Sequence, residues 1–567
     1  MPKRFFFVFT VAVLMASLAV VRAGSPFLSL AEIKPGQKGT GYTVVAGTQV
    51  RSFGVEIIGV IKGESEDRNF VLVKVSGNVF RESKGIAAGM SGRPVFVSGR
   101  LLGAISYAFD RADPRYGLVT PIEEMLRIWN EEPVSPRSAR LSPFLYPGRG
   151  FAVPVPTPLL VSGRRIPPWL TLLETQLGMR AVAIGQTGVP RGETPRPLVP
   201  GSAVAAVFAQ GDYGAVAIGT VTWVEGRRFL AFGHPLANQG VVDYPAAGAY
   251  IHRVIASLEM PFKLGVPLGQ VGRFIQDRGA GAGGLLEEQA DTITVEAVVE
   301  DRGSGKRKSF RSSIVREPGL FRSLALSALL EAIDRTLDEY APGTARVSLA
   351  LYADELTEPL RRENLFYSDK DIAVESLAEV GEAIDLLLGN EFQELTLRRL
   401  RLEVVYFPAA LVARVVKVTA DKERVRPGEK IQVEVELRPF RREKMVVPFS
   451  VELPADLAPG KLVLTARGGF LPARKEKEEG EEDVSSLPFL GAAPPASLAE
   501  AMRAFTARSH NNELILEYLP LPQELDRETS APEPVSLVQE LEYVIQGQTQ
   551  SILEVEPPPA NQNKPSS

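Results

Sequence analysis

The sequence predicts a mainly β protein with helical additions. Short apolar runs alternate with polar residues, as in FGVEIIGVI and FVLVKV, and 50 glycines and 44 prolines punctuate the 567 residues. A small number of stretches, such as TPIEEMLRIW, have helical character instead. The length allows roughly three to four domains. A content of 45% hydrophobic and 23% charged residues is that of an ordinary globular protein.

The N-terminal segment, residues 1–23, is predicted to be a secretory signal peptide. MPKR is a basic start, FFFVFTVAVLMASLAVV is an apolar stretch, and Ala23 is a small residue suited to cleavage. A retained membrane anchor is the alternative, because the apolar run is near the lower length limit for a span. No later segment is long and uncharged enough to cross a bilayer. We therefore expect an exported protein of the periplasm or cell envelope.

A first β-rich half is expected over residues 28–130. Its predicted strands are GTGYTVV, FGVEIIGVI, FVLVKV, RPVFV and LLGAISYA. TPIEEMLRIW then predicts a helix, with Thr120 as N-cap, Pro121 as first helical residue and Glu123 as reciprocal capping partner. Residues 131–200 are a proline-rich insert, placed where it could cover or gate a cleft between two halves.

A second β-rich half is expected over residues 201–317. VEGRRFLAF predicts a hairpin, and TITVEAVVE and KSFRSSIV predict further strands. AAGAYIHRVIASLEM predicts a helix, and DRGAGAGG predicts a flexible loop.

The rest of the chain divides into segments of different composition. Residues 318–400 are expected to be helical, and residues 403–470 to be a small β-sandwich, because they alternate with period two around a Pro-Gly turn. A charged linker (471–490), a C-terminal helical segment (491–550) that includes SLAEAMRAFTA, and a disordered tail (551–567) follow.

Composition excludes several kinds of chemistry. The net charge of −4 and the lack of a dense Lys/Arg cluster give no reason to expect nucleic acid. The absence of cysteine excludes thiol catalysis and disulfides. The three histidines, His234, His252 and His510, lack the His-Glu-x-x-His spacing of a metal site. GAGAGG at 279–284 lacks the Gly-Lys-Ser/Thr ending of a phosphate loop, and we interpret it as a flexible surface loop.

The GMSGRP motif makes Ser91 the candidate nucleophile. A serine hydroxyl needs a base to take its proton and donors to stabilise the oxyanion. The glycines on either side allow a tight turn in which the amides of Gly89 and Ser91 converge on one oxygen. The alternative is a β-turn whose glycines serve only the turn. The Gly-Ser turn at Ser202 lacks the following Gly-x-Pro, and we interpret it as structural.

Among the histidines, His234 is the best candidate for the base. It follows an apolar strand in FLAFGHPL, where a strand that breaks can line a cleft; the alternative is a histidine in a core or turn. His252 lies in a predicted helix beside Arg253, and His510 lies beyond the charged linker.

GIAAGMSGRPVFVSGRLLGAISYAF, followed by GLVTPIEEML, resembles the serine segment of the SpoIVB-type peptidases, the sporulation stage IV serine peptidases. IKPGQKGTGYTVVAGTQVRSFGVEIIGV resembles the strands before that segment, and GTVTWVEGRRFLAFGHPL the family's Gly-His segment. The resemblance implies a trypsin-like fold of two β-barrels with Ser-His-Asp chemistry. It also implies that Ser91 is the nucleophile and His234 the general base, on barrel halves 28–130 and 201–317.

The chain departs from the family in two respects. The family runs His, Asp, Ser, whereas here the serine half comes first; geometry, not order, defines a triad. The family's aspartate precedes its serine by about fifteen residues, a position that Ser76 occupies here. The third residue is therefore open among several carboxylates: Glu66, Asp67, Asp110, Asp113, Asp212 and Asp243.

Two hypotheses of function result. The first is an exported serine endopeptidase that acts on protein or peptide substrates without a cofactor, with the sandwich and C-terminal segment positioning substrates or envelope partners. The second is a catalytically inactive peptidase fold that serves as a binding or structural module of the cell envelope. The vacant aspartate position favours the second, and the intact GMSGRP and Gly-His-Pro motifs favour the first.

Overall fold

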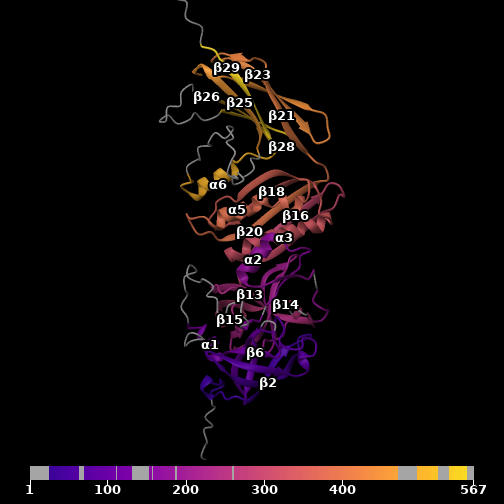
Figure 1. Cartoon of the computed structure of the whole chain (residues 1–567), viewed down its shortest axis with the longest axis vertical. Coiled ribbons are helices and arrows are strands. Elements are labelled where there is room, and N and C mark those ends of the chain that lie inside the picture. Colours follow the sequence, from indigo (N-terminus) through magenta and orange to yellow (C-terminus); the bar gives the residue numbers. More distant parts are fainter. Residues whose placement is uncertain are drawn as a thin grey trace, which may run out of the picture.

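The computed structural model describes nine stretches of the chain. Together they form an elongated molecule (Figure 1). The nine stretches are residues 25–62, 69–109, 112–130, 152–155, 157–185, 188–257, 261–469, 494–521 and 535–557. Two barrels lie at one end, a β-sandwich at the other, and a sheet with helices between them (Figure 1). The predicted mainly β class with helical additions is confirmed. The predicted signal peptide (1–23) and charged linker (471–490) lie outside the described residues.

Six described strands of the first half close into an antiparallel barrel in the order β4-β1-β2-β3-β6-β5, with β5 pairing back to β4. Their bounds are β1 Lys38–Val44, β2 Val50–Ile61, β3 Phe70–Ser76, β4 Arg93–Val97, β5 Arg100–Phe109 and β6 Tyr116–Pro121. The short 3-10 helices Leu30–Glu32 and Asn78–Phe80 flank it. Alternating side chains, including Phe53, Ile57 and Met90, fill the interior.

The second half forms another antiparallel barrel, in the order β10-β13-β14-β15-β12-β11, closed by the β10–β11 pair. Its bounds are β10 Ala203–Gly211, β11 Ala215–Glu225, β12 Arg228–Ala231, β13 Gly240–Ile255, β14 Phe262–Arg278 and β15 Gly281–Leu286. The two-barrel core expected from the resemblance is thus confirmed. The proline-rich insert contains β7 Ala152–Pro154, β8 Leu159–Val161, α2 Pro168–Leu177 and β9 Ala181–Ala183.

Three local predictions in the barrels were wrong. AAGAYIHRVIASLEM is not a helix, because its first residues continue strand β13, which pairs with β14 over most of its length. Small residues such as Ala247 and Gly248 fit between neighbouring strands, and this pairing overrides helix propensity. DRGAGAGG is not a flexible loop: it ends β14, makes a two-residue turn at 279–280, and its last three glycines lie in β15. The helix α1 spans Ile122–Arg127 without the predicted Thr120 cap, because the Thr120 hydroxyl binds elsewhere.

The region after the barrels is a layered α/β unit. Strands β16 Thr292–Asp301, β17 Arg307–Val315, β18 Gly343–Ala353, β19 Leu360–Ser368 and β20 Leu397–Phe407 extend the second barrel's sheet through the β10–β17 pair. Helices α3 Pro318–Leu337, α4 Ile372–Glu375 and α5 Ala378–Leu388 lie against them. Residues 318–400 are therefore not wholly helical, since two strands form between the expected helices.

The β-sandwich recruits strands from the C-terminal part of the chain. One sheet has the order β24-β23-β21-β28 and the other β22-β29-β25-β26-β27. The bounds are β21 Val412–Ala420, β22 Arg424–Val425, β23 Lys430–Pro439, β24 Met445–Glu452, β25 Gly460–Gly468, β26 Glu513–Leu521, β27 Val535–Glu540, β28 Val544–Gln546 and β29 Gln548–Val555.

Among the described residues of 491–550, the one helix is α6, Leu498–Thr506, where a helical segment was expected throughout. ELILEYLPL and QTQSILEV alternate with period two and pair with β25, so they are strands. The expected tail (551–567) begins inside β29, and residues 558–567 lie outside the described residues. Among the described helices, none is long and apolar enough to cross a membrane.

Candidate active site

Ser91 lies on a tight turn where the two barrels meet. Gly89 and Gly92 flank the turn with φ values of +74° and +90°, which side chains rarely adopt. A Cβ atom on Gly92 would lie 2.1 Å from the carbonyl oxygen of Thr220 and 2.4 Å from the amide of Phe232, both in the second barrel. The Thr220 amide donates to the Ser91 carbonyl at 2.9 Å. The glycines are therefore needed for contact between the barrels as well as for the turn.

Two backbone amides of this turn donate to a carbonyl, and two others have no acceptor among the described residues. Met90 donates to Ala87 at 3.1 Å, and Gly92 donates to Ile105 at 2.9 Å. Within the described stretches, the amides of Gly89 and Ser91 have no hydrogen-bond acceptor. Buried amides normally have acceptors, so two free N–H groups beside a serine hydroxyl are suited to an anionic oxygen.

His234 follows β12 on a turn that is fixed to the first barrel. The carbonyl of Gly233 accepts a hydrogen bond from the Thr120 hydroxyl at 2.7 Å. A Cβ atom on Gly233 would lie 2.9 Å from the Cβ atoms of both Ala104 and Ser106, so the turn packs directly on β5. The chain thus places His234 at the same interface as Ser91, although the histidine belongs to the second barrel.

The imidazole of His234 is held as a neutral base. Burial lowers its pKa to about 4, although the carbonyls of Pro235 and Val155 act in the opposite direction. Nδ1 lies 2.7 Å from the carbonyl oxygen of Pro235, which can only accept, so Nδ1 carries the proton. Nε2 then carries the lone pair, and this buried atom has no hydrogen-bond partner among the described residues.

Ser91 and His234 meet the same short segment of the insert. The Ser91 hydroxyl lies 3.3 Å from the Thr157 hydroxyl, and the Val155 carbonyl faces the His234 ring. Both side chains are buried, with exposed fractions of 0% and 3%. The described structure shows no direct hydrogen bond between them. Ser91 and His234 therefore contact the insert two residues apart, at Thr157 and Val155.

None of the described carboxylates considered from the sequence contacts His234. Asp113 pairs with Arg115, Asp212 lies by Arg335, and Asp243 pairs with Arg273. Ser76, at the family's aspartate position, lines a separate cavity on the outer face of the first barrel. Glu66, Asp67 and Asp110 lie outside the described residues.

A carboxylate that the sequence reasoning missed, Asp277 of β14, holds the loop after His234. Its two oxygens accept the amides of Leu236 and Ala237, each at 2.7 Å. Burial raises the pKa of Asp277 to about 6, and the donated amides oppose this shift. Nothing local in the sequence marks Asp277, because its partners lie on a distant loop.

Lys263 is a second residue that the sequence reasoning missed, and it braces the Ser91 turn. Its buried ammonium group lies 3.2 Å from the hydroxyls of Thr43 and Thr220, and its amide donates to Ala88 at 3.0 Å. Burial, and secondarily the Arg93 cation, hold the pKa of Lys263 well below its usual range. Lys263 therefore joins β14 and the two barrels directly behind the turn.

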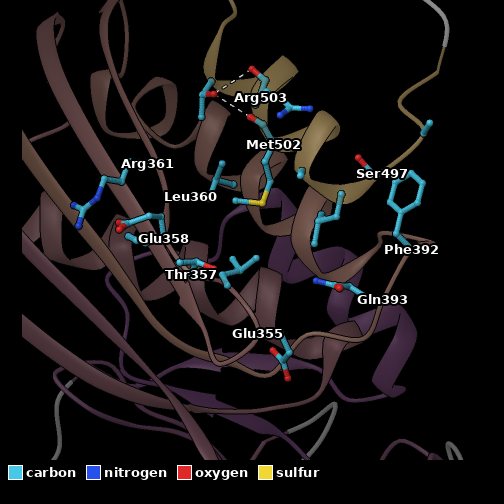
Figure 2. A pocket seen from close by; sticks show the side chains of 16 residues that line it. Glu355, Thr357, Glu358, Leu360, Arg361, Phe392, Gln393, Ser497, Met502 and Arg503 are labelled. Carbon is cyan, nitrogen blue, oxygen red and sulfur yellow. Dashed lines mark hydrogen bonds between the residues drawn. The ribbon is translucent and has the colours of Figure 1, made fainter.

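The remaining histidines and a second cavity lie elsewhere. His252 is on β13 with its ring against Tyr250, and Nδ1 of His510 lies 2.9 Å from Glu513. No group of three metal-ligating side chains occurs among the described residues. Figure 2 shows a cavity between α6 and the β18–β19 connection, lined by side chains that include Glu355, Met502 and Ser497. The Ser497 hydroxyl caps α6, so it is not a free nucleophile.

The comparison with known families finds a match in the N-terminal part of the chain. Residues 21–126 match the model of the SpoIVB peptidase S55 family. This part of the chain is similar to the SpoIVB peptidases. The match contains the Ser91 turn, whereas His234 lies beyond it. No curated protein and no solved structure matches the chain.

Proposed function

We propose that this protein is an exported serine peptidase of the SpoIVB type. The observation that supports the proposal is that a buried hydroxyl with two free amides beside it and a neutral imidazole, all at the barrel interface, contact neighbouring residues of the insert. Protein or peptide is the substrate class that the SpoIVB match supports. Export to the periplasm or envelope rests on the N-terminal sequence, MPKR followed by an apolar run.

The reaction would proceed through an acyl-enzyme. Nε2 of His234 takes the Ser91 proton as Oγ attacks the substrate carbonyl carbon, and the amides of Gly89 and Ser91 stabilise the oxyanion. When the intermediate collapses, the C–N bond breaks, and the imidazolium gives its proton to the leaving amine. Water, deprotonated by the same imidazole, then hydrolyses the Ser91 ester and regenerates the hydroxyl.

Among the described residues, a backbone carbonyl has the orienting role that an aspartate has in the family. In Ser-His-Asp enzymes the carboxylate fixes the tautomer by accepting the Nδ1 proton. Here the Pro235 carbonyl accepts that proton, and Asp277 holds the loop that carries Pro235. A neutral acceptor stabilises the imidazolium less than a carboxylate does, so we expect a slow peptidase.

The inactive envelope module remains the second candidate, because Ser91 and His234 are buried and are not hydrogen-bonded to each other. A fluorophosphonate probe with mass mapping of the labelled peptide distinguishes the two. We expect label at Ser91 in the natural protein and in the control Ser202→Ala, whose serine lies in another Gly-Ser turn. Ser91→Ala and His234→Ala should lose it. Equal labelling of the protein and Ser91→Ala would exclude Ser91 as the nucleophile.

A further inference from the structure

Residues 152–155 of the insert run along the first barrel as an added strand. β7 pairs antiparallel with β5 in the register Phe109 to Ala152, Ala108 to Val153 and Tyr107 to Pro154. The amide of Val155 continues the ladder by donating to the Ser106 carbonyl at 2.7 Å. An extended peptide thus binds the edge of β5 through main-chain hydrogen bonds.

The C-terminal end of this strand lies at the proposed catalytic pair. The Val155 carbonyl faces His234, and Thr157 reaches the Ser91 hydroxyl at 3.3 Å. A peptidase must hold an extended substrate so that one carbonyl lies at the nucleophile. Residues 152–155 provide such an extended backbone within the chain itself, and their last carbonyl, that of Val155, lies beside the histidine of the pair.

The Val155 side chain marks the pocket nearest the reacting groups. It is only 1% exposed, and it belongs to the apolar cluster of the first barrel, together with Ala87, Met90 and Ile105. A fully buried aliphatic side chain at this point shows what the pocket accepts: a residue of about the size of valine, without charge.

We propose that the groove along β5 is the substrate-binding site, and that the chain's own residues 152–155 occupy it as a substrate-like strand. The substrate class is then an extended peptide with a small branched apolar residue, in the place of Val155, before the cleaved bond. This inference rests on the proposed function. It also means that substrate must displace the internal strand, so access to Ser91 is restrained.

Displacement is tested by the rate of fluorophosphonate labelling at Ser91 in Val155→Ala. We expect a rate about tenfold above that of the natural protein, because the bound strand loses two buried methyl groups. The matched control is Val189→Ala, an exposed valine of the same insert, which should label at the natural rate. The same labelling rate in all three proteins would contradict the proposal that residues 152–155 occupy the substrate groove. It would not affect the proposal that the protein is a peptidase. Absence of label in all three would overturn the peptidase proposal.

Specificity is tested with fluorogenic peptide amides Ala-Val-Pro-X, where X is Val, Ala, Phe, Lys or Asp. We expect the largest kcat/KM for X = Val and values at least about a hundredfold lower for Lys and Asp. The series is run on the natural protein as well as on Val155→Ala, so the result does not depend on the variant's folding. A preference for Phe, Lys or Asp in a protein that labels at Ser91 would refute the assigned pocket.

Discussion

At the scale of single residues, the described part of the proposed site has a backbone carbonyl where related chemistry uses a carboxylate. Pro235 supplies the acceptor for Nδ1 of His234, and Asp277 acts one step away by holding two amides of the following loop. Arg93 likewise contacts a backbone carbonyl. Its buried guanidinium donates to the Met90 carbonyl at 2.8 Å and lies over the rings of Phe53 and Phe80. Burial is the main cause of the lowered pKa values of His234 and Arg93 at this interface.

Asp277→Asn tests the role of the carboxylate behind the histidine loop. One of the two amides loses its acceptor, so we expect the free energy of unfolding to fall by about 1–3 kcal/mol. Labelling of Ser91 should slow as well, because His234 is less well fixed. Asp243→Asn is the control, since Asp243 also accepts a backbone amide, at 2.8 Å from Asp291, but away from the site. Equal loss of labelling in both variants would contradict a positioning role for Asp277.

At the scale of elements, the Ser91 turn joins the two barrels. Substitution of Gly92 in this turn, and of Gly99 in another turn, distinguishes the cost of lost barrel contact from the cost of backbone strain. Gly92 combines a φ of +90° with backbone atoms of Thr220 and Phe232 closer than 2.5 Å to any added Cβ. Gly99, in the β4–β5 turn, has a φ of +78° and nothing within 4 Å of an added Cβ. The same substitution therefore has different costs at the two positions.

Gly99→Ala should cost about 1 kcal/mol through backbone strain alone. Gly92→Ala should cost about 3 kcal/mol more and disturb Ser91, because the barrels must move apart. Urea unfolding monitored by circular dichroism measures both values. Similar losses of unfolding free energy in the two variants would contradict the conclusion that Gly92 is needed for contact between the barrels.

Elements that the sequence predicted well are those whose pattern is local. FGVEIIGVI and FVLVKV alternate in sequence and form β2 and β3, and the GMSGRP turn has the positive φ angles expected of its glycines. The alanine-rich start of AAGAYIHRVIASLEM was misread, because its strand character comes from the partner β14 and not from its own residues. Asp277 was missed for the same reason: its partners are amides of a distant loop.

At the scale of the whole molecule, the catalytic proposal involves the two barrels and the insert, whereas the sandwich lies at the far end of the axis (Figure 1). The sandwich depends on strands far apart in sequence, since β29 lies between β22 and β25. The sequence could not predict this, because the pairing of residues 460–467 with residues 548–555 spans the charged stretch between them.

A chain that ends at Leu541 tests the independence of the two ends. It lacks β28 and β29, so the sandwich should become sensitive to proteolysis, while Ser91 labelling should stay within about twofold of the natural rate. A chain that ends at Pro557 is the control, because it keeps every described strand. Loss of labelling in the shorter chain alone would show that the sandwich supports the site.

The central claim is that a neutral, buried imidazole deprotonates Ser91. Because burial lowers the pKa of His234 from the usual 6.5 to about 4, the base stays available below pH 6.5 and is lost only as the pH falls through about 4. The most direct test is the rate of Ser91 labelling against pH, in the natural protein and in His234→Ala. We predict a half-maximal rate at a pH of about 4 for the natural protein and no such step for His234→Ala. A step near pH 6.5, or the same profile in both proteins, would contradict the claim.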